Sequence, residues 1–395
     1  MRDTRKKLRL AVAGTGAMAR YHLVRFGSTG AVVPVACYDR SRERSRNLAG
    51  ELSLRACDEI DDLLDIREID AVSVAVADPQ HYDVCAAAIR RGIPVFMEKP
   101  FTVDVSQAEH LVELQARHRV PLLINFSKMN YPAIHGLMVA VGNGSLGAIR
   151  EIELRYQQRW MAGTVWGEWW RNPRWLWRIS SSHGGGGALR DLGSHLLFLA
   201  LRLGGPVKGV HTESTIMGDR SAAHGTGYSC DMNDTFTIEL NHSGGATARL
   251  HGSYVDPRWT NHVYLRVTGT EGSAEVSAER EKNLLSLSRS GAVRTLRFAK
   301  IYSTYDAFVT GVLCGASWEA FRPSAAEGLA VQRVIAGLPS GAGGGAERAA
   351  DERPTNLDKG VPITTIMTAI VLLGQPAFEI LSIPIEGVSW KRYWR

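Results

Sequence analysis

The sequence predicts two kinds of fold in succession, an α/β domain over residues 1–127 and an α+β domain over residues 128–336. Three observations support this division. A glycine-rich turn joins a strand to a helix near the N-terminus, strands and helical segments then alternate up to residue 127, and adjacent strands dominate from residue 149 onward. Alternation is typical of a parallel sheet covered on both faces, whereas successive strands joined by hairpin turns are typical of an antiparallel sheet.

The glycine-rich turn lies between an apolar strand predicted at 8–13 and a helical pattern that starts at residue 17, and it has the form G-x-G-x-x-A. Gly14 permits the tight turn, Gly16 lets a pyrophosphate approach the backbone, and Ala19 lets the helix pack closely on the strand. The free N–H groups of the helix N-terminus favour phosphates. We therefore expect a dinucleotide-binding Rossmann domain, with an ordinary turn as the alternative.

The strand predicted at 31–38 is followed by Asp39, about where a dinucleotide fold places the acid that binds the adenosine ribose 2′-hydroxyl. A carboxylate at this position repels a 2′-phosphate, so NAD is the expected cofactor. Arg40 keeps NADP as the alternative, because an arginine can accommodate that phosphate.

A second candidate position follows the strand predicted at 93–97, which leads directly into Glu98, Lys99 and Pro100. Open α/β sheets bind ligands at the carboxyl ends of their strands. Lys99 can therefore place a positive charge beside a substrate oxygen and the nicotinamide. A surface lysine before a turn proline is the alternative.

In the second half, a glycine run at 184–187 precedes a helix that carries Asp191 and His195. Residues four apart lie on one helix face. A carboxylate beside an imidazole can hold and orient a base; a capping aspartate and a packed histidine are the alternative. The pattern H-E-x-x-H is absent, so no zinc site is expected. Strands are predicted at 149–160, 207–217, 235–241, 247–254, 262–268, 273–277, 284–288 and 293–298, and helices at 131–141, 304–314 and 325–336.

These motifs together resemble the glucose–fructose oxidoreductase / inositol dehydrogenase (Gfo/Idh/MocA) family over about residues 8–336. The motifs are G-x-G-x-x-A at 14–19, Glu-Lys-Pro at 98–100 and G-G-G-A-L-x-D-x-G-x-H at 185–195. The resemblance implies a Rossmann domain, a second domain with an open, mainly antiparallel sheet, and NAD(P)-dependent chemistry on a sugar or cyclitol. It gives Lys99, Asp191 and His195 the catalytic positions.

The resemblance also implies a homo-oligomer, a dimer or tetramer, formed through the sheet of the second domain. Phe198 stands where many members of the family place an aspartate that touches substrate hydroxyls, so we expect one such contact to be lost. The residues expected to bind the cofactor are Gly14, Thr15, Gly16, Ala17, Met18, Ala19, Asp39, Arg40, Ala77, Pro79, His81, Glu98, Lys99 and Asn125.

A cluster of tryptophans precedes the glycine run: six of the ten lie between residues 160 and 177. Aromatic faces can stack on the C–H face of a sugar ring. Packing within the domain or at a subunit interface is the alternative, and we expect it for most of them.

Composition excludes several other classes of protein. The 395 residues are 45% hydrophobic and 22% charged, with a net charge of +6. The basic residues are scattered, so no nucleic-acid partner is expected. No apolar stretch is long enough to cross a bilayer, so no membrane association is expected. Five dispersed cysteines without a C-x-x-C pattern predict reduced thiols, no metal and a cytoplasmic location. Residues 337–395 form a linker and a tail of unknown role, and residues 340–360 are expected to be disordered.

The sequence thus predicts an NAD(P)-dependent oxidoreductase acting on a secondary alcohol or ketone of a sugar, sugar nucleotide or cyclitol. In this prediction His195 takes the hydroxyl proton, Asp191 orients the imidazole and stabilises its charge, and Lys99 polarises the oxygen. Two alternatives stay open: a non-catalytic NAD-binding regulator on the same fold, and an NAD-dependent glycosidase or eliminase in which the hydride step is internal.

Overall fold

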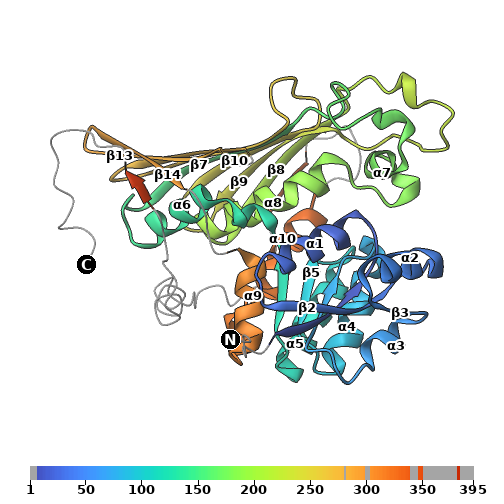
Figure 1. Ribbon diagram of the computed structural model, residues 1–395. Helices are drawn as coiled ribbons and strands as arrows, with labels where there is room; N and C mark the ends of the chain where they lie inside the picture. The colour runs from blue at the N-terminus through green and yellow to red at the C-terminus, as the bar shows by residue number, and fades with distance from the viewer. Residues whose placement is uncertain (1–6, 280–281, 299–302, 339–345, 350–379, 383–395) are drawn as a thin grey trace.

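The computed structural model describes residues 7–279, 282–298, 303–338, 346–349 and 380–382, and two sheets organise them (Figure 1). The first sheet has six strands, paired in parallel throughout. The second has ten strands, whose pairs are antiparallel except β7 with β10. The predicted fold class is therefore confirmed: an α/β Rossmann-type unit is followed by an α+β unit with a mainly antiparallel sheet.

The first sheet has the strand order β3-β2-β1-β4-β5-β6. Every residue of β4, β5 and β6 is buried, as expected of parallel strands covered on both faces by helices. The strand order reverses between β1 and β4, and open α/β sheets bind ligands at such a switch point. The elements are β1 (Leu8–Ala13), α1 (Ala17–Gly27), β2 (Val32–Tyr38), α2 (Arg42–Leu52), β3 (Arg55–Cys57), α3 (Ile60–Leu64), β4 (Ala71–Val74), α4 (His81–Arg90), β5 (Val95–Glu98), α5 (Val105–His118) and β6 (Leu122–Asn125).

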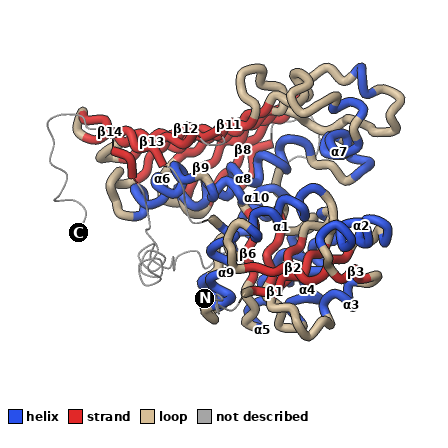
Figure 2. The backbone as a smooth tube through the Cα atoms, in the orientation of Figure 1, coloured by secondary structure: helices blue, strands red, loops and turns tan. Residues whose placement is uncertain are grey.

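The second sheet has the order β15-β8-β9-β10-β7-β11-β12-β13-β14-β16. Helices α6 and α8 pack on one face, and no helix of the described residues covers the other face (Figure 2). Buried and less buried residues alternate along β12, as a sheet with one face on the core requires. The elements are α6 (Pro132–Gly142), β7 (Ile149–Gln158), α7 (Pro173–Leu176), α8 (Gly187–Gly204), β8 (Val207–Thr215), β9 (Thr235–His242), β10 (Thr247–Ser253), β11 (Asn261–Gly269), β12 (Ser273–Glu279), β13 (Lys282–Arg289), β14 (Ala292–Phe298), β15 (Ala346–Ala349) and β16 (Ile380–Ser382).

Two helices that follow β14 pack on the first unit, and one of them also packs on the second. Helix α10 (Ala325–Ala336) packs on α5 of the first unit and on α8 of the second. Helix α9 (Thr304–Leu313) packs on α1, and its Tyr305 lies in one apolar cluster with Phe26 and Phe96. Helix α10 therefore connects the two units.

Most differences from the predicted elements concern short segments. The sequence analysis does not predict β3 and α3, because three and five residues are too few to show a period. The expected disorder of 340–360 is wrong for residues 346–349, which pair as β15 with β8, because an edge strand offers free backbone groups for a further strand. The rest of 340–360 lies outside the described residues. No helix in the described ranges is long and apolar enough to span a bilayer.

Candidate active site

The glycine-rich turn has the geometry that its sequence predicts. Gly14 has a φ of +96°, and a Cβ atom there would lie 2.3 Å from the carbonyl oxygen of Ala75, so only glycine fits. Gly16 differs: its φ is −71°, and a Cβ atom would meet no protein atom within 4 Å. The protein itself therefore does not require a glycine at position 16, whereas a ligand lying against this backbone would.

Helix α1 begins after this turn without a side-chain cap. Gly16 occupies the N-cap position, and Gly16, Ala17 and Met18 are exposed while Thr15 and Ala19 are buried. The uncapped N–H groups of an exposed helix start carry a partial positive charge that suits a pyrophosphate. These residues therefore fit the NAD that the sequence predicts.

Asp39 lies directly after β2, and its carboxylate is bonded on both oxygens. Oδ2 accepts hydrogen bonds from N and Oγ1 of Thr15 at 3.0 and 2.8 Å, and Oδ1 accepts them from N of Ser41 and Nη2 of Arg44 at 2.9 and 2.6 Å. Burial opposes the charge, but these hydrogen bonds outweigh it and lower the pKa of Asp39. The sequence analysis proposed Arg40 beside this site; Arg40 is exposed, and the arginine that reaches Asp39 is Arg44.

The turn after β4 holds three more of the predicted cofactor residues. Ala77 and Pro79 are exposed at the carboxyl end of this strand. His81 is buried, and its Nδ1 and Nε2 lie 2.8 and 3.3 Å from the backbone oxygens of Pro100 and Val76. His81 therefore holds the turns after β4 and β5 together, and its contact with the cofactor stays a prediction.

Glu98 and Asn125 are paired neighbours on β5 and β6 and belong to a buried polar network. Oε1 of Glu98 lies 2.8 Å from Nε2 of His22 and accepts a hydrogen bond from Asn125 at 2.7 Å. Asn125 also donates to Oη of Tyr305 in α9 at 3.0 Å. Burial opposes the charge of Glu98, but His22, the charge of Lys99 and the hydrogen bond from Asn125 together outweigh it, and the pKa of Glu98 is lowered. The network fixes the end of β5 immediately before Lys99; whether Glu98 and Asn125 also touch the cofactor stays a prediction.

Lys99 and Asp191 meet where the two units adjoin. Nζ of Lys99 forms an ion pair with Oδ1 of Asp191 and lies 3.4 Å from the carbonyl oxygen of the same residue. The Asp191 side chain is 30% exposed, so the pair borders an open space. Burial opposes both charges, but the pair outweighs it: the pKa of Lys99 is raised and that of Asp191 is lowered. Both groups are therefore charged at neutral pH.

Two residues that the sequence analysis missed hold the second oxygen of Asp191. Oη of Tyr254 donates a hydrogen bond to Oδ2 at 2.8 Å, and Nε of Arg178 lies 3.9 Å from the same oxygen. Tyr254 is fully buried and packs on Trp160, with 4.8 Å between ring centroids. The carboxylate is thus fixed from several sides before any substrate arrives.

His195 lies one turn further along α8 than Asp191, but the two side chains are not bonded. Nδ1 of His195 is buried and has no hydrogen-bond partner among the described residues. The imidazole lies edge-on to Phe126 and Tyr156, with centroids 6.2 and 6.0 Å away. The prediction that Asp191 orients His195 is therefore wrong, because the Asp191 oxygens already bind Lys99 and Tyr254.

The surroundings of His195 set its charge. Burial and the nearby charges of Lys99 and Lys128 lower the pKa of His195 well below its usual value, and Asp191 raises it by a smaller amount. The imidazole is therefore neutral at neutral pH and available to accept a proton. The predicted charge stabilisation by Asp191 agrees in direction with this balance.

The glycine run and the tryptophan-rich segment pack on one another. A Cβ atom on Gly185 would lie 2.1 Å from the carbonyl oxygen of Trp177, so this glycine permits the close contact. One aromatic stack runs through Trp166, Trp175, Trp160 and Tyr254. This arrangement favours the packing alternative, and it connects the tryptophans to the residue that holds Asp191.

Phe198 is 2% exposed and stacks on Phe126, with centroids 4.4 Å apart and rings 6° from parallel. An apolar stack therefore occupies the place where the family resemblance would put a carboxylate. Of the residues missed by the sequence analysis, Lys128 had a usable signal, since it follows the carboxyl end of β6. Tyr254 and Arg178 had none that spacing reveals.

Two protein-family models match this chain. Residues 8–126 match the family model described as Oxidoreductase family, NAD-binding Rossmann fold. Residues 137–275 match the GFO/IDH/MocA C-terminal domain. Together these two matches cover more than half of the chain.

Several curated relatives are named dehydrogenases. UDP-N-acetylglucosamine 3-dehydrogenase of Acidithiobacillus ferrooxidans is 32% identical over 146 residues, which cover 37% of this chain and 44% of the relative. D-apiose dehydrogenase of Paraburkholderia graminis is 24% identical over 281 residues, which cover 70% of this chain and 69% of the relative. The match thus spans less than half of the first relative and about two thirds of the second.

Solved structures share the fold. Levoglucosan dehydrogenase in complex with NADH and L-sorbose superposes with a TM-score of 0.73 at 19% identity, covering 84% of this chain and 95% of that one. An inositol dehydrogenase homolog complexed with NAD+ from Azotobacter vinelandii gives 0.70 at 20% identity, covering 84% of this chain and 94% of that one. At these identities the likeness establishes the arrangement of both sheets.

Proposed function

Because this chain belongs to the Gfo/Idh/MocA family of NAD-binding oxidoreductases, we propose that it exchanges a hydride between NAD and a sugar, sugar nucleotide or cyclitol, at a secondary alcohol or the corresponding ketone. The observation that carries this proposal is the convergence of three groups from two units of the fold. A charged lysine, Lys99, is paired with Asp191 from α8, and a neutral histidine, His195, lies one turn away.

The cofactor would be held by the glycine-rich turn at 14–19 and by Asp39. When bound, NAD supplies the hydride acceptor for the carbinol carbon. The charge of Asp39 disfavours a 2′-phosphate, which supports NAD over NADP.

The charge of each side chain in the site determines its proposed role in the reaction. Lys99 donates a hydrogen bond to the substrate oxygen and stabilises the negative charge that develops there. His195 accepts the hydroxyl proton, because its lowered pKa leaves it neutral. Asp191 keeps Lys99 charged and in place, and Tyr254 fixes Asp191 in turn. In the reverse direction the imidazolium of His195 returns the proton.

A turnover assay on a panel of sugars and cyclitols with NAD tests the proposal. Net NADH formation that depends on the sugar is the expected result. A regulator on this fold would bind NAD without turning over any sugar. An NAD-dependent glycosidase or eliminase would release a leaving group without net NADH. Either of the last two results would overturn the proposal.

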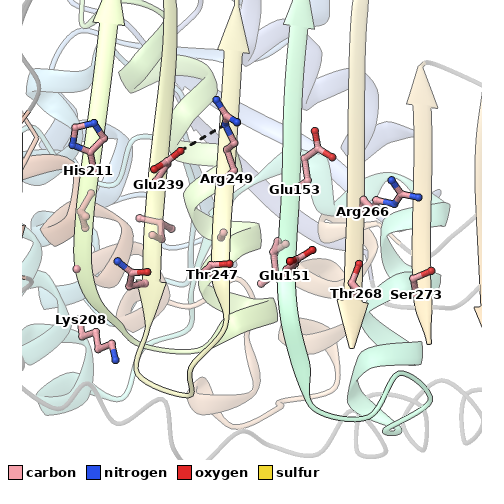
Figure 3. A pocket seen from close by; sticks show the side chains of 16 residues that line it. Glu151, Glu153, Lys208, His211, Glu239, Thr247, Arg249, Arg266, Thr268 and Ser273 are labelled. Carbon is pink, nitrogen blue, oxygen red and sulfur yellow. Dashed lines mark ion pairs between the residues drawn. The ribbon is translucent and has the colours of Figure 1, made fainter. Parts of the chain in front are cut away.

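The uncovered face of the ten-stranded sheet is the proposed contact between copies of this chain. Figure 3 shows a hollow on this face, with the helices behind the strands and charged side chains projecting forward. Glu151 and Glu239 share it with Arg249 and Arg266, and Nε of Arg249 lies 3.8 Å from Oε1 of Glu239. Such a mixed surface can complement itself across a two-fold axis.

Sedimentation tests this contact. The expected wild-type species is a dimer or tetramer. The double variant Arg249→Glu, Arg266→Glu is expected to shift the protein toward monomer, because it turns a mixed surface acidic. Arg42→Glu on the exposed start of α2 is the matched control. A monomeric wild type would contradict the proposed interface.

The compartment is proposed from the cysteines. All five are free thiols, and three of them are buried. Five cysteines that are all free thiols favour a reducing compartment, which supports the proposal of a cytoplasmic location.

A further inference from the structure

Lys128 is a largely buried lysine that has no carboxylate partner among the described residues. It lies in the short 3₁₀ turn Ser127–Asn130 after β6 and is 9% exposed. Its Nζ lies over the rings of Tyr156 and Tyr131, at 4.5 and 5.3 Å from their centroids. Within the described ranges, Nζ makes no hydrogen bond and no ion pair. Aromatic faces attract an ammonium but do not replace its hydration.

Other largely buried cations of the chain are treated differently. Arg220, with 8% of its side chain exposed, pairs with Asp234 at 2.8 Å. Lys99 pairs with Asp191, and Arg202 pairs with Glu327. A buried charge without a counterion is costly, and proteins ordinarily pair or neutralise it. Lys128 differs from these three side chains, because no carboxylate of the described residues pairs with it.

The position of Lys128 connects it to the proposed reaction. The ring of Tyr156 lies between Lys128 on one side and His195 on another, at the centroid distances given above. The charge of Lys128 also contributes to the lowered pKa of His195. Lys128 and the proposed proton acceptor therefore contact the same tyrosine ring.

The cations of the site differ in their partners. Lys99 and Arg178 both lie against Asp191. Asp78, whose pKa is raised by burial, is a further acid near Lys99. Lys128 is the cation of this group that forms no ion pair with a carboxylate of the described residues.

We propose that the substrate carries an anionic group, a carboxylate or a phosphate, and that Lys128 binds it beside the reacting alcohol. This inference rests on the proposed function and narrows its substrate class to acidic sugars. A bound oxyanion would supply the counterion that the described residues do not give Lys128, and its ion pair with the ammonium would form at a largely buried side chain. The tyrosine rings of residues 131 and 156 hold the ammonium in place for it.

The pH dependence of binding follows from the surroundings of Lys128. Burial and the neighbouring charge of Lys99 lower the pKa of Lys128 to about 7, while Asp191 and Glu98 act in the opposite direction. The ammonium is charged below this value and neutral above it. Affinity for an acidic sugar is therefore expected to fall as the pH rises through and above 7.

Calorimetry on the NAD-loaded full chain tests the inference with three related ligands: glucose, glucuronate and glucose 6-phosphate. Wild type is expected to bind one of the anionic ligands at least about tenfold more tightly than glucose, and Lys128→Met is expected to remove that preference. Comparing glucuronate with glucose 6-phosphate shows whether the site binds a carboxylate or a phosphate. Lys7→Met, at an exposed position immediately before β1, is the matched control for loss of a positive charge.

Three outcomes would overturn the inference. They are equal binding of charged and neutral sugars by wild type, a preference retained in Lys128→Met, and a loss of NAD affinity in this variant without a change in sugar preference. If Lys128→Met does not fold, the pH dependence of glucuronate and phosphate-ester binding to wild type decides, since a flat profile from pH 6 to 9 is incompatible with the site. Failure of the proposed function appears separately, as sugar binding without NADH formation in the turnover assay.

Discussion

The glycine-rich turn and the surroundings of Asp191 differ in what holds their chemical groups in place. In the turn the backbone does so, through the left-handed Gly14 and the uncapped start of α1. Around Asp191, side chains from distant segments do so: Lys99 follows a strand of the first sheet, and Tyr254 follows a strand of the second. Changes in the turn should therefore affect cofactor binding or folding, whereas changes around Asp191 should affect turnover with the cofactor still bound.

Among the variants that separate turnover from cofactor binding, His195→Ala is expected to have the largest effect, which is a loss of kcat. A general base contributes about 10²- to 10⁴-fold to the rate, so kcat should fall by about that factor. The affinity for NAD, measured by calorimetry, should stay near wild type, because the imidazole contacts Phe126 and Tyr156, which lie outside the turn proposed to bind the pyrophosphate. His183→Ala, an exposed histidine just before the glycine run, is the control. Wild-type turnover in His195→Ala would remove this residue from the proton route.

A smaller loss is expected from Tyr254→Phe, which keeps the ring on Trp160 and removes the hydrogen bond to Asp191. A hydrogen bond to a charged group contributes about 1.5–3 kcal/mol, so kcat should fall about 10- to 100-fold. Since Tyr254 acts through Asp191, the KM for the sugar should change little. Tyr264→Phe on the uncovered sheet face controls for loss of a phenol. An unchanged kcat would mean that Lys99 holds Asp191 without help.

The smallest effect is expected from Gly16→Val in the glycine-rich turn, and it concerns the affinity for NAD. A Cβ atom at this position meets no protein atom within 4 Å, so thermal unfolding should be little changed. The affinity for NAD should fall about tenfold or more, equivalent to about 1.4 kcal/mol, because the side chain enters the space left for the pyrophosphate. Gly14→Ala is the informative partner: its contact with Ala75 and its positive φ should lower the melting temperature itself. If Gly16→Val binds NAD as wild type does, the pyrophosphate lies elsewhere.

Contiguous motifs explain why the turn was predictable from sequence and the rest of the site only in part. G-x-G-x-x-A places its residues by local geometry, and the positions of Lys99, Asp191 and His195 on their elements follow from strand ends and helix spacing. Spacing shows which residues share a helix face but does not show what lies opposite that face. Helix spacing therefore predicts that Asp191 orients His195, whereas in the structure Lys99 and Tyr254 bind the Asp191 oxygens.

The strand β15 and the surroundings of Lys128 could not be predicted from the sequence for a related reason. The strand β15 exists because β8 lies at an edge of the second sheet, and sheet order is not visible in a polar segment such as 346–349. Lys128 belongs to no motif, and its lack of a counterion becomes apparent only when the neighbours of Tyr156 are known.

The pH dependence of single-turnover oxidation of a neutral sugar tests most directly the central claim, that neutral His195 takes the proton while Lys99 stays charged. Burial and the charges of Lys99 and Lys128 place the pKa of His195 below its usual 6.5, so the rate should be constant around neutral pH. It should fall only when the pH drops through a value below 6.5, since protonation then removes the base. In His195→Ala this acid limb should be absent. An acid limb that persists unchanged in His195→Ala, or one centred above 6.5 in wild type, would contradict the account.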